Sequence, residues 1–562
     1  MVLFAIPTTA FFILQNNQIQ TYLTKKIANE ISENLNTKIE VESVNFRFFN
    51  KVVLRNVYVE DQLQDTLMYS KEIICSLSKL DRKEKIIDIK AINLQEAKIY
   101  LNKFDSLQPI NLIFSKDSMS YNDSASQNKK KWEVLFKNIE MHNSVFWYKS
   151  FRKKERPNGV INFNDLICYI EDLNVRDLKI ENGFVKFYNK KLKFKEKTGF
   201  YAYNVKFLMS IGKEHMTFKN VNIRTPYSYI NSDSVVFRHN NYDEYQQFAK
   251  NIYLDFAFQE SNVSFNDIAY YSSIFKDIPI NIVLSGRVYS KLSSFKGKDL
   301  SFQIGEQTEL ITDFSLNGLP DYNEMFMYID FKKLTTYAKD FEIINKFLKN
   351  NKKISIPESF DKLGIINYKG NFAGFYDDFV TYGKFTSDLG DVSTDISLRP
   401  DISQSLAFSG NLVTNDFNVG ELFPGTERIG RISADANIKG SLNTKKEVDA
   451  TTKGVIHNIE INDYNYQNIQ IDGFLTENTY DGFLSIADPN IELDFQGGID
   501  FSKEIPSFNF VASVPSTNLY GLNIDKKDST SQLSFEISAK FEGVNIDDIV
   551  GEVNFNKASI RK

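Results

Sequence analysis

The sequence predicts a mostly β protein with a long antiparallel-type twisted sheet, an N-terminal helix and few short helices. Aromatic residues make up 14% of the 562 residues, with 48 Phe and 28 Tyr, and these types, together with Ile, Val and Thr, favour pleated, half-buried surfaces. Beyond residue 39, apolar and polar residues alternate with the period of a strand. Turn residues separate these windows roughly every 10 to 16 positions in the second half of the chain, which predicts roughly 25 to 30 strands in all.

The first element is expected to be a membrane anchor. Residues 1–14 carry no charge but are fewer than the about 20 residues that span a bilayer, so we interpret 1–18 as the outer part of a transmembrane helix that begins upstream. Basic residues before Met1 would then lie on the cytoplasmic side, and the rest of the chain would lie across the membrane. A buried core helix is the alternative. The apolar anchor residues are Leu3, Phe4, Phe11, Phe12, Ile13 and Leu14.

An amphipathic helix is predicted next, over residues 19–36. Ile19, Leu23, Ile27, Ile31 and Leu35 recur every four residues, which places them in one apolar stripe along a helix. Such a helix could cap the open end of a sheet or lie on the membrane surface. The best helix after it is predicted over 337–350.

The strand pattern is clearest in four windows late in the chain, 391–399, 430–440, 491–501 and 533–541. In the second of these, Ile432 and Ile438 share one face, while Arg431 and Lys439 share the other. One-sided strands are typical of antiparallel sheets with one face buried, whereas strands of parallel sheets read as continuous apolar runs. An α/β enzyme fold is therefore disfavoured.

Composition and motifs argue against an enzyme, a metal site and a nucleic-acid partner. The net charge is -5 with both signs interleaved, so no large basic face is available to hold a phosphate backbone. The four His residues are dispersed, and no phosphate-binding loop or nucleophile elbow occurs. Cys75 and Cys168 are too few and too far apart for a disulfide framework or a zinc site. We therefore expect no catalytic residue, no metal and no cofactor.

Several phrases of the sequence resemble one known family. Residues 408–423 (FSGNLVTNDFNVGELF) and 430–440 (GRISADANIKG), followed by 466–473, 482–490 and 497–500, are similar to the recurring strands of TamB-like translocation and assembly proteins from Bacteroidetes-type bacteria. Residues 39–46 and 61–70 resemble the AsmA-like start of that family. The resemblance implies an AsmA-like N-terminal β region over 37–335, a repetitive β-groove region over 336–562, and a chain that continues beyond 562.

The resemblance also implies a trough and a cellular role. The sheet would curl into a β-taco behind a single-pass inner-membrane anchor, in the periplasm of a Gram-negative envelope. The chain would move phospholipid between the inner and outer membranes or, alternatively, act as a scaffold that assists outer-membrane protein translocation and assembly. Phospholipid and the inner membrane are the expected partners. An outer-membrane barrel protein of the Omp85 type would be reached through the missing C-terminal part.

The groove lining is expected to consist of large apolar side chains from the alternating strands. Acyl chains on such a face would gain about 0.8 kcal/mol per buried CH₂. The same side chains would form an ordinary core in a β-sandwich. The sequence is compatible with both an open groove and a closed core. A secreted adhesin or solenoid would need repeats of fixed period, which these strands lack. The expected lining residues are Leu398, Ile432, Ile438, Leu493, Phe495, Phe535, Ile537 and Phe541.

Overall fold

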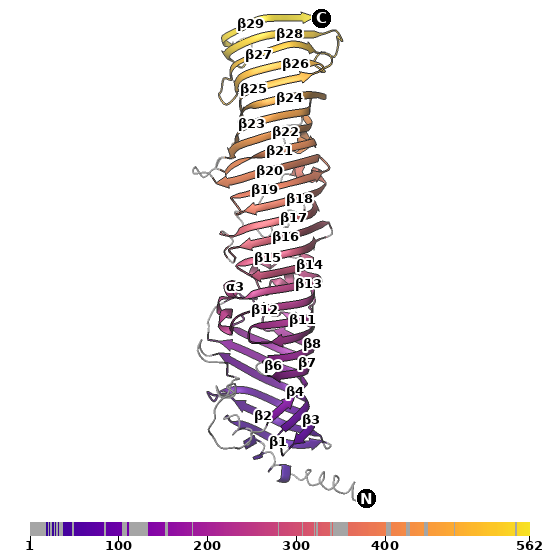
Figure 1. Cartoon of the computed structure of the whole chain (residues 1–562), viewed down its shortest axis with the longest axis vertical. Coiled ribbons are helices and arrows are strands. Elements are labelled where there is room, and N and C mark those ends of the chain that lie inside the picture. Colours follow the sequence, from indigo (N-terminus) through magenta and orange to yellow (C-terminus); the bar gives the residue numbers. More distant parts are fainter. Residues whose placement is uncertain are drawn as a thin grey trace. The chain divides into compact units, whose positions relative to one another are not determined.

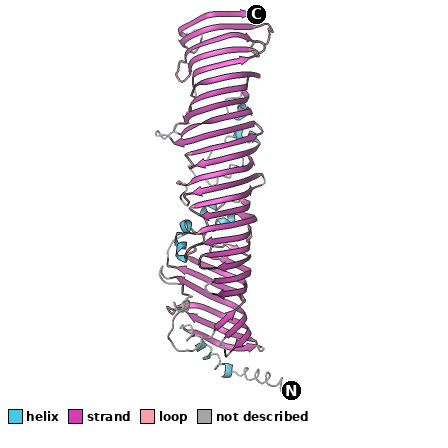
Figure 2. Ribbon diagram, in the orientation of Figure 1, coloured by secondary structure: helices cyan, strands magenta, loops and turns pink. Residues whose placement is uncertain are grey.

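The structure confirms the predicted fold class. It is a computed structural model in which 71% of the residues lie in strands of a long mixed sheet, with few short helices, consistent with a curled groove (Figure 2). The structure describes residues 18–561 apart from 21, 23–24, 27, 30–31, 33–36, 48–49, 82, 84–85, 104–109, 112–132, 152–155, 182–183, 279, 306, 320, 322–323, 338–339, 341–357, 401–405, 423–427, 443–447, 477 and 546–547.

The chain divides into two compact units, unit 1 (Met1–Leu292) and unit 2 (Ser293–Lys562). The boundary that the resemblance implies, at 335/336, falls inside a strand of unit 2. The described residues between 18 and 32 are helical. The predicted anchor over 1–18 lies outside the described residues, except for Gln18.

Unit 1 contains the first fourteen strands. They are β1 (Ile39–Arg47), β2 (Lys51–Glu60), β3 (Thr66–Asp81), β4 (Ile86–Lys103), β5 (Glu133–Phe136), β6 (Ile139–Ser150), β7 (Asp165–Glu181), β8 (Phe184–Glu196), β9 (Tyr201–Ala202), β10 (Asn204–Ile211), β11 (His215–Arg224), β12 (Tyr229–Arg238), β13 (Tyr253–Ser264) and β14 (Asn281–Lys291). Its short helices include η2 (Tyr242–Gln247), α3 (Phe248–Asn251), α4 (Phe265–Ile268) and η3 (Ser273–Phe275). In Figure 1 these strands carry the indigo to magenta colours.

Two pairings in unit 1 depart from the antiparallel pattern that the sequence predicts. Strand β4 pairs in parallel with β5 and with β6, whereas β1 to β4 and β6 to β8 pair as antiparallel neighbours. Parallel neighbours need a crossover of a dozen or more residues, and the connection from Lys103 to Glu133 supplies that length. The sheet is therefore mixed.

Unit 2 is built from antiparallel neighbours in chain order, so each strand from β15 onward pairs with the next. Its strands are β15 (Ser294–Ile304), β16 (Thr308–Asn317), β17 (Phe326–Tyr337), β18 (Ile365–Gly374), β19 (Phe379–Ser387), β20 (Gly390–Pro400), β21 (Leu406–Asn418), β22 (Ile429–Leu442), β23 (Val448–Ile461), β24 (Tyr464–Leu475), β25 (Thr479–Asp488), β26 (Ile491–Asp500), β27 (Ser507–Asn518), β28 (Gln532–Glu542) and β29 (Val550–Arg561). Short helices η5 (Glu358–Leu363) and α6 (Val419–Leu422) also belong to it.

The first residue of the helix predicted over 337–350 belongs to a strand in the structure. Tyr337 is the last residue of β17, where it pairs with Ile365 of β18. A cross-strand partner on a sheet surface overrides the weak helical preference of an end residue. Apart from Asp340, the remaining residues of the predicted helix lie outside the described part of the chain.

An aligned crease bends the strands of unit 1. Leu94 and Ala97 of β4 both belong to the same buried cluster although they lie three positions apart, and in β7 Ile170 and Leu173 repeat this spacing. Side chains of a regular strand alternate, so residues three apart share a face only where an extra residue is inserted. The register across β3 and β4 stays constant on both sides of this point, so each strand carries its extra residue at the same rung.

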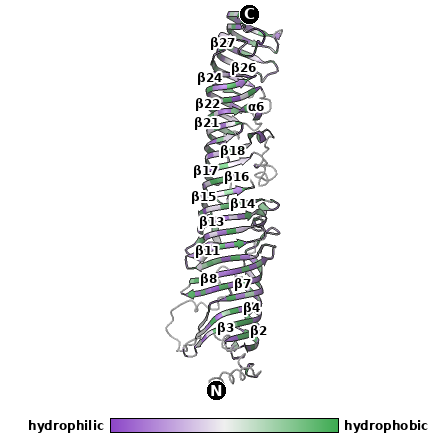
Figure 3. Cartoon of the chain, turned by 90° about the vertical axis from the view of Figure 1, so that its right-hand side faces the viewer, coloured by the Kyte–Doolittle hydropathy of each residue, from purple (hydrophilic) through white to green (hydrophobic). Residues whose placement is uncertain are grey.

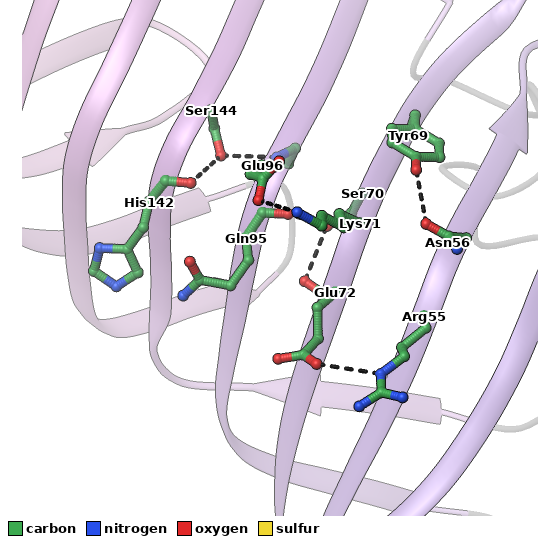
Figure 4. Close-up of polar contacts among 11 residues, drawn as sticks. Arg55, Asn56, Tyr69, Ser70, Lys71, Glu72, Gln95, Glu96, His142 and Ser144 are labelled. Carbon is green, nitrogen blue, oxygen red and sulfur yellow. Dashed lines mark hydrogen bonds and ion pairs between the residues drawn. The ribbon is translucent and has the colours of Figure 1, made fainter.

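The backbone shows how the crease is made. Asn56, Glu96 and Asn143, on β2, β4 and β6, have φ of 46°, 48° and 48°, the left-handed conformation found at many bulges, where a strand bends. Two hydroxyls satisfy backbone groups beside it, and Figure 4 shows both contacts: Ser70 donates to the Glu72 carbonyl (3.1 Å) and Ser144 to the His142 carbonyl (2.9 Å). Each serine is 2% exposed or less. Its buried hydroxyl needs a hydrogen-bond partner, and the carbonyl beside the crease supplies one.

Unit 2 also carries bulges. The ladder shifts register within β15, β17, β21, β22, β23, β27 and β29, and the shifts in β21, β22 and β23 lie on neighbouring strands close to Ile432, while the ladder of β19 with β20 and that of β25 with β26 run without a shift. Strands without an inserted residue keep strict alternation over their length. Apolar and polar residues accordingly alternate along the strands (Figure 3).

Candidate functional site

One face of the unit 2 sheet carries all of the predicted lining residues. They lie in β20, β22, β26 and β28. Residues that are direct register partners project from the same face of a sheet, so the pairings decide which side chains share it. We call the face that bears Leu398 the apolar face of unit 2, and the opposite face its outer face.

Two rows of register partners cross the unit from β15 to β29. Row A contains Phe295, Leu316, Met327, Gly374, Phe379, Leu398, Phe408, Gly440, Ala450, Leu475, Tyr480, Ile499, Phe508, Phe541 and Gly551. Row B contains Leu300, Thr312, Phe331, Gly370, Gly383, Thr394, Leu412, Ala436, Gly454, Ile471, Leu484, Phe495, Ala512, Ile537 and Phe555. Neither row contains a charged residue.

The remaining predicted residues fall on the same face. Ile432 and Ile438 lie at even spacing from Gly440 of row A in a strand whose alternation is regular. Leu493 lies two positions from Phe495 of row B, and Phe535 lies two positions from Ile537. At about 4.8 Å per strand, β15 to β28 extend this face over roughly 60 Å.

The apolar face of unit 2 is only partly covered. Each of the predicted lining residues is half-buried and none falls in the fully buried class. In row A, the large side chains Phe379, Leu475 and Phe508 are likewise half-buried. Side chains in a closed sandwich core pack against a second sheet and lose nearly all contact with water. The face therefore differs from the closed core that remained open as an alternative in the sequence.

A cap covers one part of this face. Leu363 of η5 and Leu422 of α6 are buried with Ile366, Leu389 and Phe417, and the Ser359 hydroxyl donates to the Leu422 carbonyl (2.6 Å). The predicted lining residue Ile432 packs against this cluster. Ile432 therefore forms part of the surface on which the cap packs.

Glycines on the apolar face allow neighbouring strands to approach closely. Gly482 is the register partner of both Gly473 and Gly497. A Cβ on Gly482 would lie 2.4 Å from the Cα of Gly473, which is closer than real atoms approach. Tyr480 lies over Gly473, where a Cβ would meet its ring at 2.7 Å, and its hydroxyl donates to the Phe483 carbonyl at 2.8 Å. Glycines, and an aromatic ring that lies over one of them, thus shape the surface of the apolar face.

Sequence reasoning missed a buried polar network at the edge of this face. It attributed Asp488, Pro489 and Asn490 to turn chemistry alone, but Asp488 is only 9% exposed. The Tyr464 hydroxyl and the Gln467 amide both donate to its carboxylate, at 2.5 and 3.0 Å. Burial, and next the hydrogen bond to Asp488, raise the pKa of Tyr464. The tyrosine in YNY of β24 gives no signal in the sequence that would reveal its partner across the sheet.

The corresponding face of unit 1 is closed. Leu94, Ala97 and Met141 belong to one buried cluster, and Phe200 and Val205 to another. Cys75 and Cys168 are free and half-buried, and Cys75 packs against the first cluster. Burial raises the pKa of each thiol to about 11, so both are protonated at neutral pH.

Glu196 and Asp267 are two of the buried acidic side chains of unit 1. Glu196 is 1% exposed and accepts hydrogen bonds from the Thr198 amide and hydroxyl at 2.7 and 2.5 Å. Asp267 is 7% exposed and accepts from Thr225 and Ser228 at 2.6 and 2.5 Å. Burial, and next the charge of Asp267, raise the pKa of Tyr271 to about 12. Each acid is held by neighbouring hydroxyls and a short turn, as expected of structural groups.

The remaining predictions concern a membrane-spanning helix and a metal site. Within the described residues, no helix has the length and apolar character needed to cross a bilayer. The anchor residues Leu3, Phe4, Phe11, Phe12, Ile13 and Leu14 lie outside that part of the chain. No group of three metal-binding side chains occurs among the residues that the structure describes.

Comparison with protein-family models, with curated proteins and with solved structures finds no match to this chain. The fold and the apolar face of unit 2 are thus the observations from which its function must be argued.

Proposed function

We propose that this chain is an inner-membrane-anchored periplasmic protein that moves phospholipid between the inner and outer membranes along the apolar face of unit 2. The observation that carries the proposal is the pair of uncharged rows A and B, which run from β15 to β29 and whose large side chains are mostly half-buried. The resemblance to TamB-like proteins supports the same role.

The dimensions of the face suit an acyl chain. The hydrocarbon core of a bilayer is about 30 Å thick, so one acyl chain reaches about 15 Å, and a face of roughly 60 Å offers several successive positions. Each CH₂ that leaves water contributes about 0.8 kcal/mol. Because a hydrophobic gain of this kind has no direction, a chain can shift from one row position to the next with little change in free energy.

A phospholipid could lie with its tails on rows A and B and its headgroup in water. The outer face presents charged partners, for example Lys453 bonded to Asp472 at 2.7 Å. Its exposed apolar side chains, such as Val413, Val455 and Phe483, alternate with polar register partners such as Asp435 and Gln496. The continuous apolar path for acyl chains therefore lies on the apolar face of unit 2. The proposed conduit therefore needs no cofactor and no catalytic residue.

Charging the apolar face tests the proposal. The double variant Phe495→Asp with Phe535→Asp places two carboxylates on the face, and we expect it to lose co-purifying phospholipid in native mass spectrometry while its circular dichroism stays unchanged. Gln496→Asp with Ser538→Asp is the matched control, since both residues are exposed on the outer face. Equal lipid content in the two double variants would rule out the conduit.

The second candidate is a scaffold that assists outer-membrane protein assembly by strand pairing. Such a scaffold would offer main-chain hydrogen bonds to a client strand at an edge of the sheet. A proline substitution in the strand that pairs with the client would remove a donor and should reduce client binding without reducing bound lipid.

A further inference from the structure

A hollow of about 390 Å³ lies in unit 1. Ile99, Leu101 and Phe146 pack against the buried cluster. Because side chains alternate along a strand, Tyr100, Asn102, Trp147 and Lys149 project from the opposite face. The residues lining the hollow are Asp65, Tyr100, Asn102, Lys103, Trp147, Lys149, Ser150 and Phe151.

A rigid aromatic pair forms one wall. Tyr100 and Trp147 are register partners on β4 and β6, and their ring centroids lie 5.7 Å apart. The indole N–H of Trp147 donates to Asp165 at 3.0 Å, and Asp165 is also bonded by Lys197 at 2.6 Å. The Trp147 ring is thereby fixed in orientation, as a binding platform requires.

A buried carboxylate fixes another part of the lining. Asp61 is 3% exposed and accepts hydrogen bonds from the backbone of Asp65 at 3.0 Å and from the amide of Asn111 at 2.8 Å. Asn111 in turn accepts from the Asn102 amide at 2.9 Å. One buried acid therefore positions both the turn that carries Asp65 and the strand end that carries Asn102.

Two lysines of the lining can bind an anion. Lys103 and Lys149 contribute two positive charges and Asp65 one negative charge. Lys149 is also the register partner of Asp165, and after the hydrogen bond from Lys197 its charge helps to lower the pKa of that carboxyl. A lysine ammonium binds phosphate as a point charge, and a phosphate monoester carries about −1.5 to −2 at pH 7. Two ammonium groups match that charge better than they match a single carboxylate.

We infer that this hollow binds a phosphorylated sugar, with the ring on the Tyr100 and Trp147 platform and the phosphate between Lys103 and Lys149. The volume lies at the lower end of the range for small-molecule sites, about 300 to 1,000 Å³, which suits one sugar ring. The faces of aromatic rings are electronegative and attract the C–H face of a sugar. Asp65 and Asn102 would accept hydrogen bonds from ring hydroxyls. The inference does not rest on the proposed lipid transport.

Fluorescence of Trp147 reports binding directly. The chain has two Trp residues, so a Trp132→Phe background leaves Trp147 as the sole indole. We expect saturable quenching by glucose 1-phosphate with a Kd on the order of 0.1 to 1 mM, and weaker effects of glucose and of inorganic phosphate. Lys103→Gln with Lys149→Gln should weaken binding at least about tenfold, since two charge-assisted contacts are lost.

A control and a second source complete the test. Lys206→Gln, an exposed lysine on β10, should leave quenching unchanged and controls for the loss of surface charge. Vesicles of phosphatidylcholine with and without a phosphorylated glycolipid distinguish a lipid headgroup from a free sugar phosphate, by co-sedimentation of the chain. Binding in either arm that depends on the two lysines supports the site. Absence of saturable binding in both arms, or equal binding by the lysine double variant, would overturn it.

Discussion

The two units are built from the same kind of alternating strands but bury their apolar side chains to different extents. In unit 1 the apolar face is buried in clusters around Leu94 and Phe200, whereas in unit 2 the rows around Leu398 and Phe495 are half-buried. The difference does not come from hydrophobicity alone. In unit 1 Asn56 of β2 and Glu96 of β4 carry an inserted residue at the same rung, whereas in unit 2 the ladder of β19 with β20 and that of β25 with β26 run without a shift.

An aligned crease bends a sheet along one line. Where each strand bends at the same rung, the two arms of the sheet can turn toward each other and bury their apolar sides together. In unit 1, burial of the apolar side chains therefore depends on where extra residues are inserted, in addition to which residues are apolar.

The largest expected effect sharpens this contrast in packing. Leu94→Ala in the closed cluster of unit 1 should destabilise the protein by about 2 to 5 kcal/mol, since it leaves a cavity. Leu484→Ala on row B of unit 2 should cost about 1 kcal/mol, because that side chain is already half in water. Urea denaturation of the two variants measures the difference. Equal losses would contradict an open face in unit 2.

A smaller effect is expected at the crease itself. Ser144 is 2% exposed and accepts a hydrogen bond from the Ala97 amide at 3.0 Å. Ser144→Ala should destabilise unit 1 by about 1 to 3 kcal/mol, since a buried donor loses its partner. Ser538→Ala, on the exposed outer face of unit 2, should change the free energy of unfolding by less than about 0.5 kcal/mol. A neutral Ser144 variant would show that the hydroxyl does not support the bend.

Thiol reactivity compares how accessible the two faces are to water. Burial raises the pKa of Cys75 to about 11, so its reaction with a disulfide reagent should rise about tenfold per pH unit until that pKa is passed. A cysteine placed on row B by Leu484→Cys, in a Cys75→Ser and Cys168→Ser background, should have a pKa near about 8.5. It should react about a hundredfold faster than Cys75 at pH 7.5. Similar rates would indicate that row B is as closed as unit 1.

The smallest effect concerns acid stability in unit 1. The hydrogen bond from Lys197, opposed by partial burial and assisted by the Trp147 indole, holds the pKa of Asp165 below its usual value. A depressed pKa contributes stability that is present above the unfolded value, about 3.9, and is lost as the pH falls through the folded value. Asp165→Asn should therefore flatten the acid limb of the stability curve below about pH 4. An unchanged acid limb in thermal melts would exclude this contribution.

The sequence predicted the sheet of unit 2 better than the fold of unit 1, for a physical reason. Strands β20 and β26, and β22 from Ile432 onward, alternate without interruption, so Leu398, Ile438 and Phe495 could be assigned to one face from period two alone. At the crease of unit 1 the alternation of side chains between the two faces is interrupted in each strand. Leu94 and Ala97 fall on one face only because of an inserted residue. A period-two pattern cannot reveal such an insertion without the register of the neighbouring strand.

The openness of the face and the hollow in unit 1 were beyond the sequence for similar reasons. Whether Phe495 faces water or a second sheet depends on packing between distant segments, which one strand does not encode. The platform of Tyr100 and Trp147 depends on the parallel pairing of β4 with β6, across a long connection. Two aromatics about fifty positions apart give no shared local signal.

Site-specific photo-crosslinking tests the central claim most directly. A benzophenone amino acid at Phe495 lies on row B of the apolar face, one at Gln496 lies on the outer face, and one at Leu94 lies in the closed cluster of unit 1. Irradiation in cells followed by mass spectrometry should give a phospholipid adduct at position 495 and none at 496 or 94. Adducts at all three positions, or none at 495, would contradict an open apolar face that carries lipid.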